Sequence, residues 1–173
     1  MPLAAAFVHP SGRGREYQAA GDYPMPSEGE CEQVLQGCVT APPDEPIPSN
    51  DTRNFWTPNY GLRRFRDLFL PRQLAVLCAA IDELHELHEA MIRTGMDAEF
   101  AKATTSYLGL ALDGVADRNS ALCRWTARGD GSRIANTFGR QALPMVWDFA
   151  ESNPFAGAGA DLVSNVDRCA EVI

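Results

Sequence analysis

Apolar side chains repeat at helical spacing over a long stretch that begins at a proline. Between Pro71 and Gly95 the repeating positions, three and four residues apart, are Leu74, Leu77, Cys78, Ile81, Leu84, His88, Met91 and Ile92. This spacing places them all on one face of an α-helix, and a proline is well suited to the first helical turn. The pattern predicts one long helix over this stretch, which ends at Gly95.

A second long helix is expected to start near Asp97 and to run toward Asn119 or Cys123. Its buried stripe is expected to consist of Phe100, Ala103, Thr104, Tyr107, Leu108, Ala111, Leu112 and Val115. The connection between the two helices is short, which favours an antiparallel helical hairpin.

Two shorter helices are expected in the last third of the chain. The first covers residues 141–151, with Pro144 in its opening turn and an inward face of Leu143, Val146, Trp147 and Ala150. The second covers residues 161–173. Residues 127–132 contain two glycines and are expected to be an exposed loop. No run of alternating β-branched residues is long enough to require a sheet.

Prolines interrupt the first third of the chain. They are Pro24, Pro26, Pro42, Pro43, Pro46, Pro48 and Pro58. Only residues 27–37 are expected to be helical there, because Ser27 and Glu30 form a capping box and Gly37 is a stop signal. The expected fold class is therefore mainly α, with a long helical hairpin, shorter helices and an extended Pro-rich N-terminal arm. We divide the chain into the arm, residues 1–58, and a helical domain, residues 59–173.

Charge and cysteine content exclude several classes of protein. The net charge of -8 and the pI of about 4.8 argue against a protein that holds nucleic acid by bulk electrostatics, so DNA contacts must be local. The five cysteines form no C-x-x-C pair, and an odd number fits neither a disulfide framework nor a zinc ribbon. Neither a signal peptide nor a membrane-spanning stretch is expected, and the cytoplasm is the expected compartment, with no membrane partner.

Two candidate sites are weighed and rejected on the residues alone. Asp82, His85 and His88 lie on one helical face, but a metal site would need further carboxylates from other helices, and a solvated surface is the simpler interpretation. Residues 153–159 resemble a glycine-rich cofactor loop. That loop normally follows a strand and opens with an acidic residue, whereas this one follows a predicted helix and opens with Asn153.

Two sets of residues are candidates for DNA contact. The first is the arginine cluster Arg63, Arg64, Arg66 and Arg72, which lies beside Phe55, Trp56, Tyr60 and Phe65. Guanidinium groups and aromatic rings suit phosphate contacts and base stacking. The other interpretation is that these arginines pair with the many acids of the chain, because Lys102 is its only lysine.

The second candidate set is polar and begins near the expected end of the second long helix. It comprises Asp117, Arg118, Asn119, Arg124, Asn136, Arg140 and Gln141. Arginine binds guanine bidentately, and amide side chains read adenine. Equally, Asp117 and Arg118 can form a structural network that fixes the helix ends under Trp125 and Trp147, and we favour this second interpretation because buried polar groups need partners.

Several segments together resemble one enzyme family. They are Asp44-Glu45-Pro46-Ile47-Pro48, Tyr60-Gly61-Leu62, Asp67-Leu68-Phe69-Leu70-Pro71-Arg72-Gln73-Leu74, Asp117-Arg118-Asn119-Ser120, Cys123-Arg124-Trp125 and the run from Asn136 to Glu151. Over roughly residues 40–173 the chain resembles the middle of the large bacterial adenine-specific DNA methylases that carry an N-terminal domain of unknown function. In that family the region is an insertion in a Rossmann-like domain, between the cofactor loop and the Asp-Pro-Pro-Tyr catalytic motif.

The resemblance implies methyl transfer from S-adenosylmethionine to adenine N6 in a flipped base. The catalytic tetrapeptide and the cofactor loop are absent from this chain, so no catalytic, cofactor-binding or metal-binding residue is assigned to it. We therefore expect a non-catalytic helical segment of such a methyltransferase, inactive alone, which serves DNA positioning or scaffold packing. Its expected partners are DNA and the remaining methyltransferase segments. The alternative is a stand-alone helical protein-interaction module, and a complete small methyltransferase is disfavoured.

Overall fold

The computed structural model describes residues 4–8, 15–51, 55–128, 131–157 and 160–172. Within these described residues the structure is mixed but helix-rich, so helices set the architecture. In chain order the elements are β1 (Ala4–Val8), β2 (Arg15–Ala19), η1 (Ala20–Asp22), α1 (Glu28–Gly37), η2 (Thr57–Tyr60), η3 (Phe65–Leu68), α2 (Pro71–Arg93), α3 (Ala98–Ala116), β3 (Arg124–Arg128), β4 (Gly131–Ala135) and α4 (Leu162–Ala170), where η denotes a short 3-10 helix.

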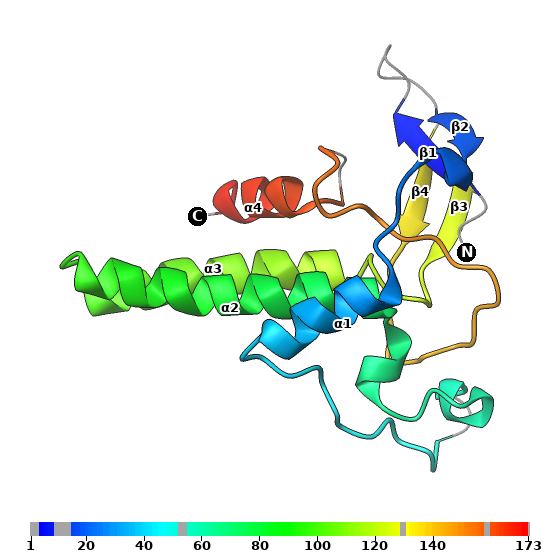
Figure 1. Cartoon of the computed structure of the whole chain (residues 1–173), viewed down its shortest axis with the longest axis horizontal. Helices are drawn as coiled ribbons and strands as arrows, with labels where there is room; N and C mark the ends of the chain where they lie inside the picture. The colour runs from blue at the N-terminus through cyan, green and yellow to red at the C-terminus, as the bar shows by residue number, and fades with distance from the viewer. Residues whose placement is uncertain (1–3, 9–14, 52–54, 129–130, 158–159, 173) are drawn as a thin grey trace.

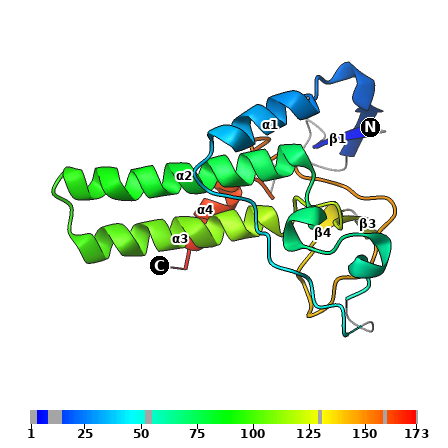
Figure 2. The ribbon, with the colours of Figure 1, turned by 60° about the horizontal axis from the view of Figure 1, so that its bottom comes forward.

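Helices α2 and α3 lie side by side and run in opposite directions (Figures 1 and 2). Pro71 occupies the first turn of α2, and the backbone N–H of Leu70 donates to Gln73 Oε1 at 2.8 Å. Gly95 follows α2 with a φ of 85°, a conformation that favours glycine and reverses the chain. Asp97 then caps α3, because its Oδ1 accepts from Phe100 N at 3.0 Å.

Helix α3 ends at Ala116, earlier than the sequence predicts. Residues 117–123 form turns instead, and their backbone groups bind segments far away in the chain. Ala121 N donates to Leu68 O at 2.8 Å, and Cys123 O accepts from Ala150 N at 3.0 Å. These long-range bonds compete with continuation of the helix, and they make residues 117–123, the 117–123 turn, a point where several segments meet.

Helices α1 and α4 pack on the two long helices, α1 against α2 and α4 against α3. The capping box predicted for residues 27–37 is confirmed, since Ser27 Oγ accepts from Glu30 N and Glu30 Oε2 accepts from Ser27 N at 2.7 Å. The helix predicted within 161–173 is confirmed over residues 162–170, and Asp161 caps it by accepting from Ser164 N at 2.8 Å. The approach of α4 to α3 is close, because a Cβ added at Gly114 would lie 2.4 Å from Asn165 Oδ1.

The helix predicted for residues 141–151 is wrong. This segment is irregular, with bends at residues 141 and 147–148, and Leu143 pairs with Phe55 in an isolated parallel bridge. Pro144 lacks an N–H group, and the amides that a helix would use are bound elsewhere, as the bond from Ala150 N to Cys123 O shows. Trp147, which was expected to face inward, is 75% exposed.

The sequence contains no run that requires a sheet, yet the structure has short strands. Two short antiparallel hairpins occur, β1 with β2 and β3 with β4. The stretch 127–132, expected to be a loop, includes the ends of β3 and β4, while residues 129–130 lie outside the described residues. Each strand has only five residues, too short for alternation to stand out in the sequence. The rings of Tyr17 and Trp125, whose centroids lie 6.2 Å apart, bring the two hairpins together.

Residues 43–47 lie alongside residues 63–66, which come just before α2, and are hydrogen-bonded to them. Ile47 N donates to Arg63 O at 2.8 Å, and Arg66 N donates to Pro43 O at 2.9 Å. These bonds cross the boundary that we expect at residue 58. Ile47 itself is buried in a core cluster with Leu68, Leu122 and Leu143.

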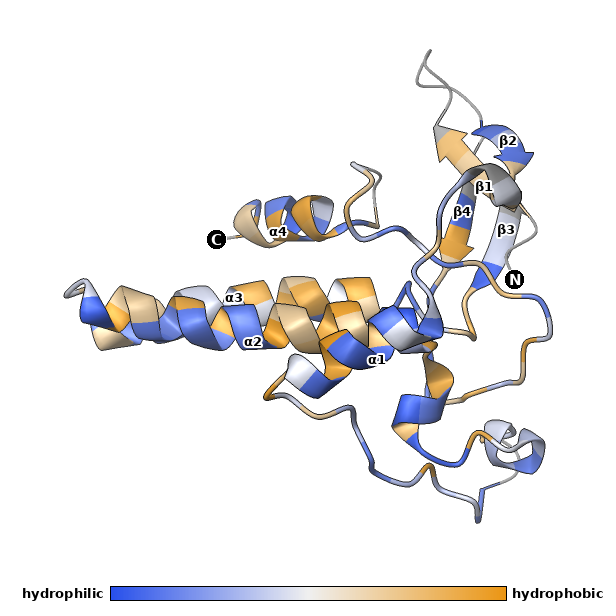
Figure 3. Ribbon diagram, viewed as in Figure 1, coloured by the Kyte–Doolittle hydropathy of each residue, from blue (hydrophilic) through white to orange (hydrophobic). Residues whose placement is uncertain are grey.

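A second core cluster lies between the long helices and contains Leu77, Leu112 and Val115. Phe69 packs against both clusters. Figure 3 shows orange, apolar bands on both α2 and α3, the two helices whose residues form this second cluster.

Candidate functional site

Two arginines of the predicted DNA-binding cluster share one carboxylate. Arg64 Nη1 bonds both the side chain and the backbone carbonyl of Asp44, and Arg66 Nη1 lies 3.2 Å from Asp44 Oδ1. These arginines are 50% exposed, so the ion pairs are worth about 0–1 kcal/mol each and hold residue 44 against residues 64–66 only weakly. Among the described residues the Arg63 guanidinium, which is exposed, has no acidic partner.

Arg72 stands apart from that cluster. Its Nη2 lies 2.7 Å from Glu151 Oε1, and both side chains are only about a quarter exposed, at 26% and 23%. The other carboxylate oxygen of Glu151 accepts from Gln73 Nε2 at 2.6 Å. Gln73 is 2% exposed and its Oε1 accepts from Leu70 N, so Glu151 anchors a distant segment to the first turn of α2. Arg72 therefore has a structural role.

The second polar set forms a network around Asp117. Its side chain accepts from Asn136 Nδ2 and, at 2.8 Å, from Phe138 N, while its carbonyl accepts from Thr137 N at 2.8 Å. Beneath it, Ser120 Oγ lies 2.7 Å from Thr137 Oγ1, and Cys123 Sγ lies 3.2 Å from the same hydroxyl. Asp117 therefore lies in a structural network, as the second interpretation expects, but its partners are Asn136, Thr137 and Phe138 and not Arg118.

Arg118 and Asn119 lie in the same turn and contribute little surface. Asn119 is only 3% exposed, which prevents its amide from reading a base edge. Arg118 is half-buried, and its Nη1 donates to Gly114 O at 3.3 Å. Arg124, at the start of β3, and Arg140, in the chain after β4, are both exposed. The eight DNA-binding candidates thus lie on five separate stretches of chain and differ in burial and in partners.

Asp82 is engaged by the backbone that follows α1. Its two carboxylate oxygens accept from Val39 N at 2.7 Å and from Thr40 N at 2.9 Å. His88 Nδ1 lies 3.3 Å from Thr105 Oγ1. Within the described ranges, no three histidine, cysteine, aspartate or glutamate side chains gather in a way that would hold a metal ion.

Replacing Asp82 by alanine is expected to weaken the pH dependence of stability in acid. The pKa of Asp82 is lowered, mainly by a side-chain hydrogen bond from Thr40 and further by the amides of Val39 and Thr40. A lowered pKa means that the stabilisation is fully present above the unfolded pKa, about 3.9, and is lost as the pH falls through the folded value.

The measurement is the urea midpoint of both proteins at neutral pH and at several acid values. We expect the wild-type midpoint to exceed that of Asp82→Ala at neutral pH and the two to converge in acid. Asp113→Ala, which removes an exposed carboxylate of α3, is the matched control. Parallel curves for wild type and Asp82→Ala would contradict the assignment.

The glycine-containing segment after Glu151 folds back toward α4. Asn153 Oδ1 accepts from Phe155 N at 3.0 Å, and Leu162 N donates to Pro154 O at 2.9 Å. The segment upstream of it is neither a named strand nor the predicted helix. Residues 158–159, the end of the rejected cofactor-loop motif, lie outside the described residues.

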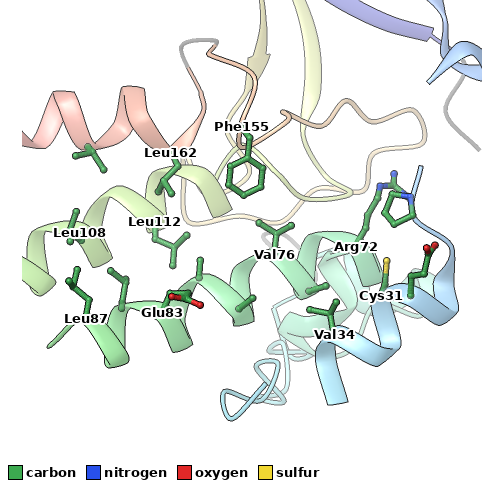
Figure 4. A pocket seen from close by; sticks show the side chains of 17 residues that line it. Cys31, Val34, Arg72, Val76, Glu83, Leu87, Leu108, Leu112, Phe155 and Leu162 are labelled. Atoms are coloured by element: carbon green, nitrogen blue, oxygen red, sulfur yellow. The ribbon is translucent and has the colours of Figure 1, made fainter. Parts of the chain in front are cut away.

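An apolar groove, which the sequence analysis did not predict, is formed mainly by the helices. It has a volume of about 750 Å³ and runs across α2, with α1 on one side and α4 with Phe155 on the other (Figure 4). Of its 17 lining residues all but Glu30, Arg72 and Glu83 are apolar. Cavities that bind ligands have volumes of about 300–1,000 Å³ and largely apolar walls, so this groove is the best candidate binding site.

The groove could not be found in the sequence because four elements build it. Two signals were present: the narrow stripe of Cys31 and Val34 in α1, and the small residues Ala75 and Ala79 in α2. Each of these two signals, taken by itself, is also typical of ordinary packing between helices. Val34 is nevertheless 47% exposed, so its stripe is only partly covered by α2.

Comparison of the chain with protein-family models, with curated proteins and with solved structures gives no match. In the part of the chain that the structure describes, the helices are too short or too polar to cross a bilayer.

Proposed function

We propose that this chain is a non-catalytic helical segment related to the S-adenosylmethionine-dependent adenine-specific (N6) DNA methyltransferases, and that its role is packing against another polypeptide. The apolar groove between α1 and α4 is the single observation that carries the packing role. Exposed apolar surface of this kind marks interaction sites in soluble proteins. The link to methyltransferases rests on the sequence resemblance alone. The compartment that we propose for such a segment is the cytoplasm.

The groove also suits the alternative, a stand-alone helical protein-interaction module. Both functions use the same surface, and they differ in whether the occupant belongs to a methyltransferase.

The proposal predicts that the isolated chain transfers no methyl group from S-adenosylmethionine to duplex DNA. It also predicts that a neutral dye such as Nile red brightens on the wild-type protein and not on Ala79→Glu, which places a charge in the groove. Methyl transfer by the isolated chain, or equal dye response of both proteins, would overturn it.

DNA positioning is a second candidate function, favoured by the exposed Arg63 and by the exposed rings of Trp56 and Tyr60. It ranks lower because Arg64 and Arg66 share Asp44, Arg72 pairs with Glu151 and Asn119 is buried. The net charge of -8 further opposes approach of a polyanion.

We expect no saturable binding when a fluorescent DNA duplex is titrated with micromolar protein at low and at moderate salt. The anisotropy of the duplex is the measurement, and Arg63→Ala/Arg64→Ala/Arg66→Ala is the comparison protein. Binding that weakens with salt and is lost in the triple variant would instead establish DNA positioning by this cluster.

A further inference from the structure

The length and the apolar lining of the groove suit the binding of a helix. Its floor on α2 includes Val76, Ala79, Glu83 and Leu87, which recur at helical spacing and span about 16 Å of helix axis. Ala79 carries only a methyl group, so another backbone can approach α2 closely at the centre. Figure 4 shows Val34 rising from α1 on one side and Leu108, Leu112 and Leu162 on the other.

Among the described residues the lining consists mainly of helical side chains, with Pro26 and Phe155 as the two residues outside helices. Its helical residues come from α1, α2, α3 and α4, whose internal backbone groups are bonded within their own helices. An extended strand that entered the groove would therefore leave its own N–H and C=O groups without partners, at a cost of about 1–3 kcal/mol for each buried group. A helix satisfies its backbone internally, and an apolar stripe on one of its faces can fill the groove.

The charge of the groove is negative. Arg72, its one basic residue, is neutralised by Glu151. Glu30 is held as a carboxylate, because hydrogen bonds from Ser27 lower its pKa. Glu83 is exposed, and within the described residues no ion pair engages it. An anionic ligand such as a fatty acid would meet these carboxylates, and a second copy of the chain would bring a further net charge of -8.

We propose that the groove binds an amphipathic α-helix of a partner polypeptide, with aliphatic side chains inserted between α1 and α4 and with a lysine or arginine placed beside Glu83. This inference rests on the proposed packing function and specifies its partner. The apolar face supplies affinity, and the basic edge supplies orientation and selectivity.

The test uses a pair of synthetic helical peptides and the whole chain. Each peptide has about 18 residues, with leucines at three- and four-residue steps and alanine or glutamine elsewhere. One peptide carries lysines along the edge of its leucine stripe, and the other carries glutamates at the same positions. Binding is followed by fluorescence anisotropy of labelled peptide, and the gain in peptide helicity by circular dichroism.

We expect the lysine peptide to bind about three- to tenfold more tightly than the glutamate peptide. Glu83→Arg is expected to reverse that order, and Ala79→Glu is expected to weaken both peptides at least about tenfold. Glu86→Arg is the matched control, because Glu86 is exposed on the same helix but does not line the groove, and it should leave the order unchanged. Circular dichroism and urea midpoints of each variant confirm that it is folded.

Several results would overturn the inference. If the two peptides bind equally, or if Glu83→Arg leaves the order of their affinities unchanged, the partner does not place a basic residue beside Glu83. A dimer in sedimentation that Ala79→Glu dissolves would assign the groove to a second copy. Displacement of Nile red by dodecanoate would assign it to a small apolar ligand. If Nile red binds wild type but neither peptide binds, the helix inference fails and the packing function stands, whereas equal dye response of wild type and Ala79→Glu ends both.

Discussion

Replacing Leu68 by alanine is expected to lower the free energy of unfolding by about 2–5 kcal/mol. Leu68 is fully buried, with 0% of its surface exposed, and it packs with Ile47, Leu122 and Leu143. These partners come from three segments far apart in the chain, so a cavity here would loosen residues 43–47, the 117–123 turn and the irregular 141–151 segment together.

Urea unfolding followed by circular dichroism measures the change. Leu110→Ala is the matched control, because Leu110 is 59% exposed on α3 and its truncation is expected to change the free energy by no more than about 0.5 kcal/mol. If Leu68→Ala and Leu110→Ala unfold at the same urea concentration, the cluster around Leu68 does not hold these segments together.

Replacing Gly114 by alanine is expected to destabilise the protein by about 1–3 kcal/mol, although the same change usually stabilises a helix. The new Cβ would lie 2.4 Å from Asn165 Oδ1 and 2.9 Å from Asn165 Cγ. Asn165 is 6% exposed and its Nδ2 donates to Asp161 O at 2.7 Å, so the amide cannot move aside without breaking the start of α4. Helix α4 must therefore shift away from α3.

Gly109→Ala is the matched control within the same helix. Nothing lies within 4 Å of a Cβ added at Gly109, so this change is expected to raise stability by about 0.5–1 kcal/mol. Urea midpoints report the stability, and limited proteolysis reports the release of α4. Gly114→Ala combined with Asn165→Ala should cost less than the sum of the two single changes. Stabilisation by Gly114→Ala alone would show that α4 does not press on α3 at this point.

The helices could be predicted because their signals are local. Pro71 and the stripe that follows it define α2, Asp97 defines the start of α3, and the Ser27 capping box defines α1. Each of these signals lies within one or two turns of the element that it specifies. Short-range periodicity and capping are the information that a single sequence carries most directly.

The failures occur where distant residues decide the structure. Apolar spacing within 141–151 imitates a helix, but Leu143 fills the cluster around Leu68 and Ala150 N bonds Cys123 O. The ion pairs of Arg64 and Arg66 with Asp44, about twenty residues earlier, also depend on residues distant in the chain, and the DNA-binding role of these arginines stays a prediction. The groove is the extreme case, because none of its four helices signals it alone.

The 117–123 turn has a consequence for the order of folding. Its bonds reach Leu68, Thr137, Ala150 and Ser152, so it closes several loops of twenty residues or more at one place. The α2–α3 pair needs only a short connection and can form early, whereas these closures carry a larger entropic cost and come later. During synthesis, the two long helices can therefore form before Ala150 and Ser152 have been added to the chain. The hydrogen bonds of the 117–123 turn are completed only when these two residues are present.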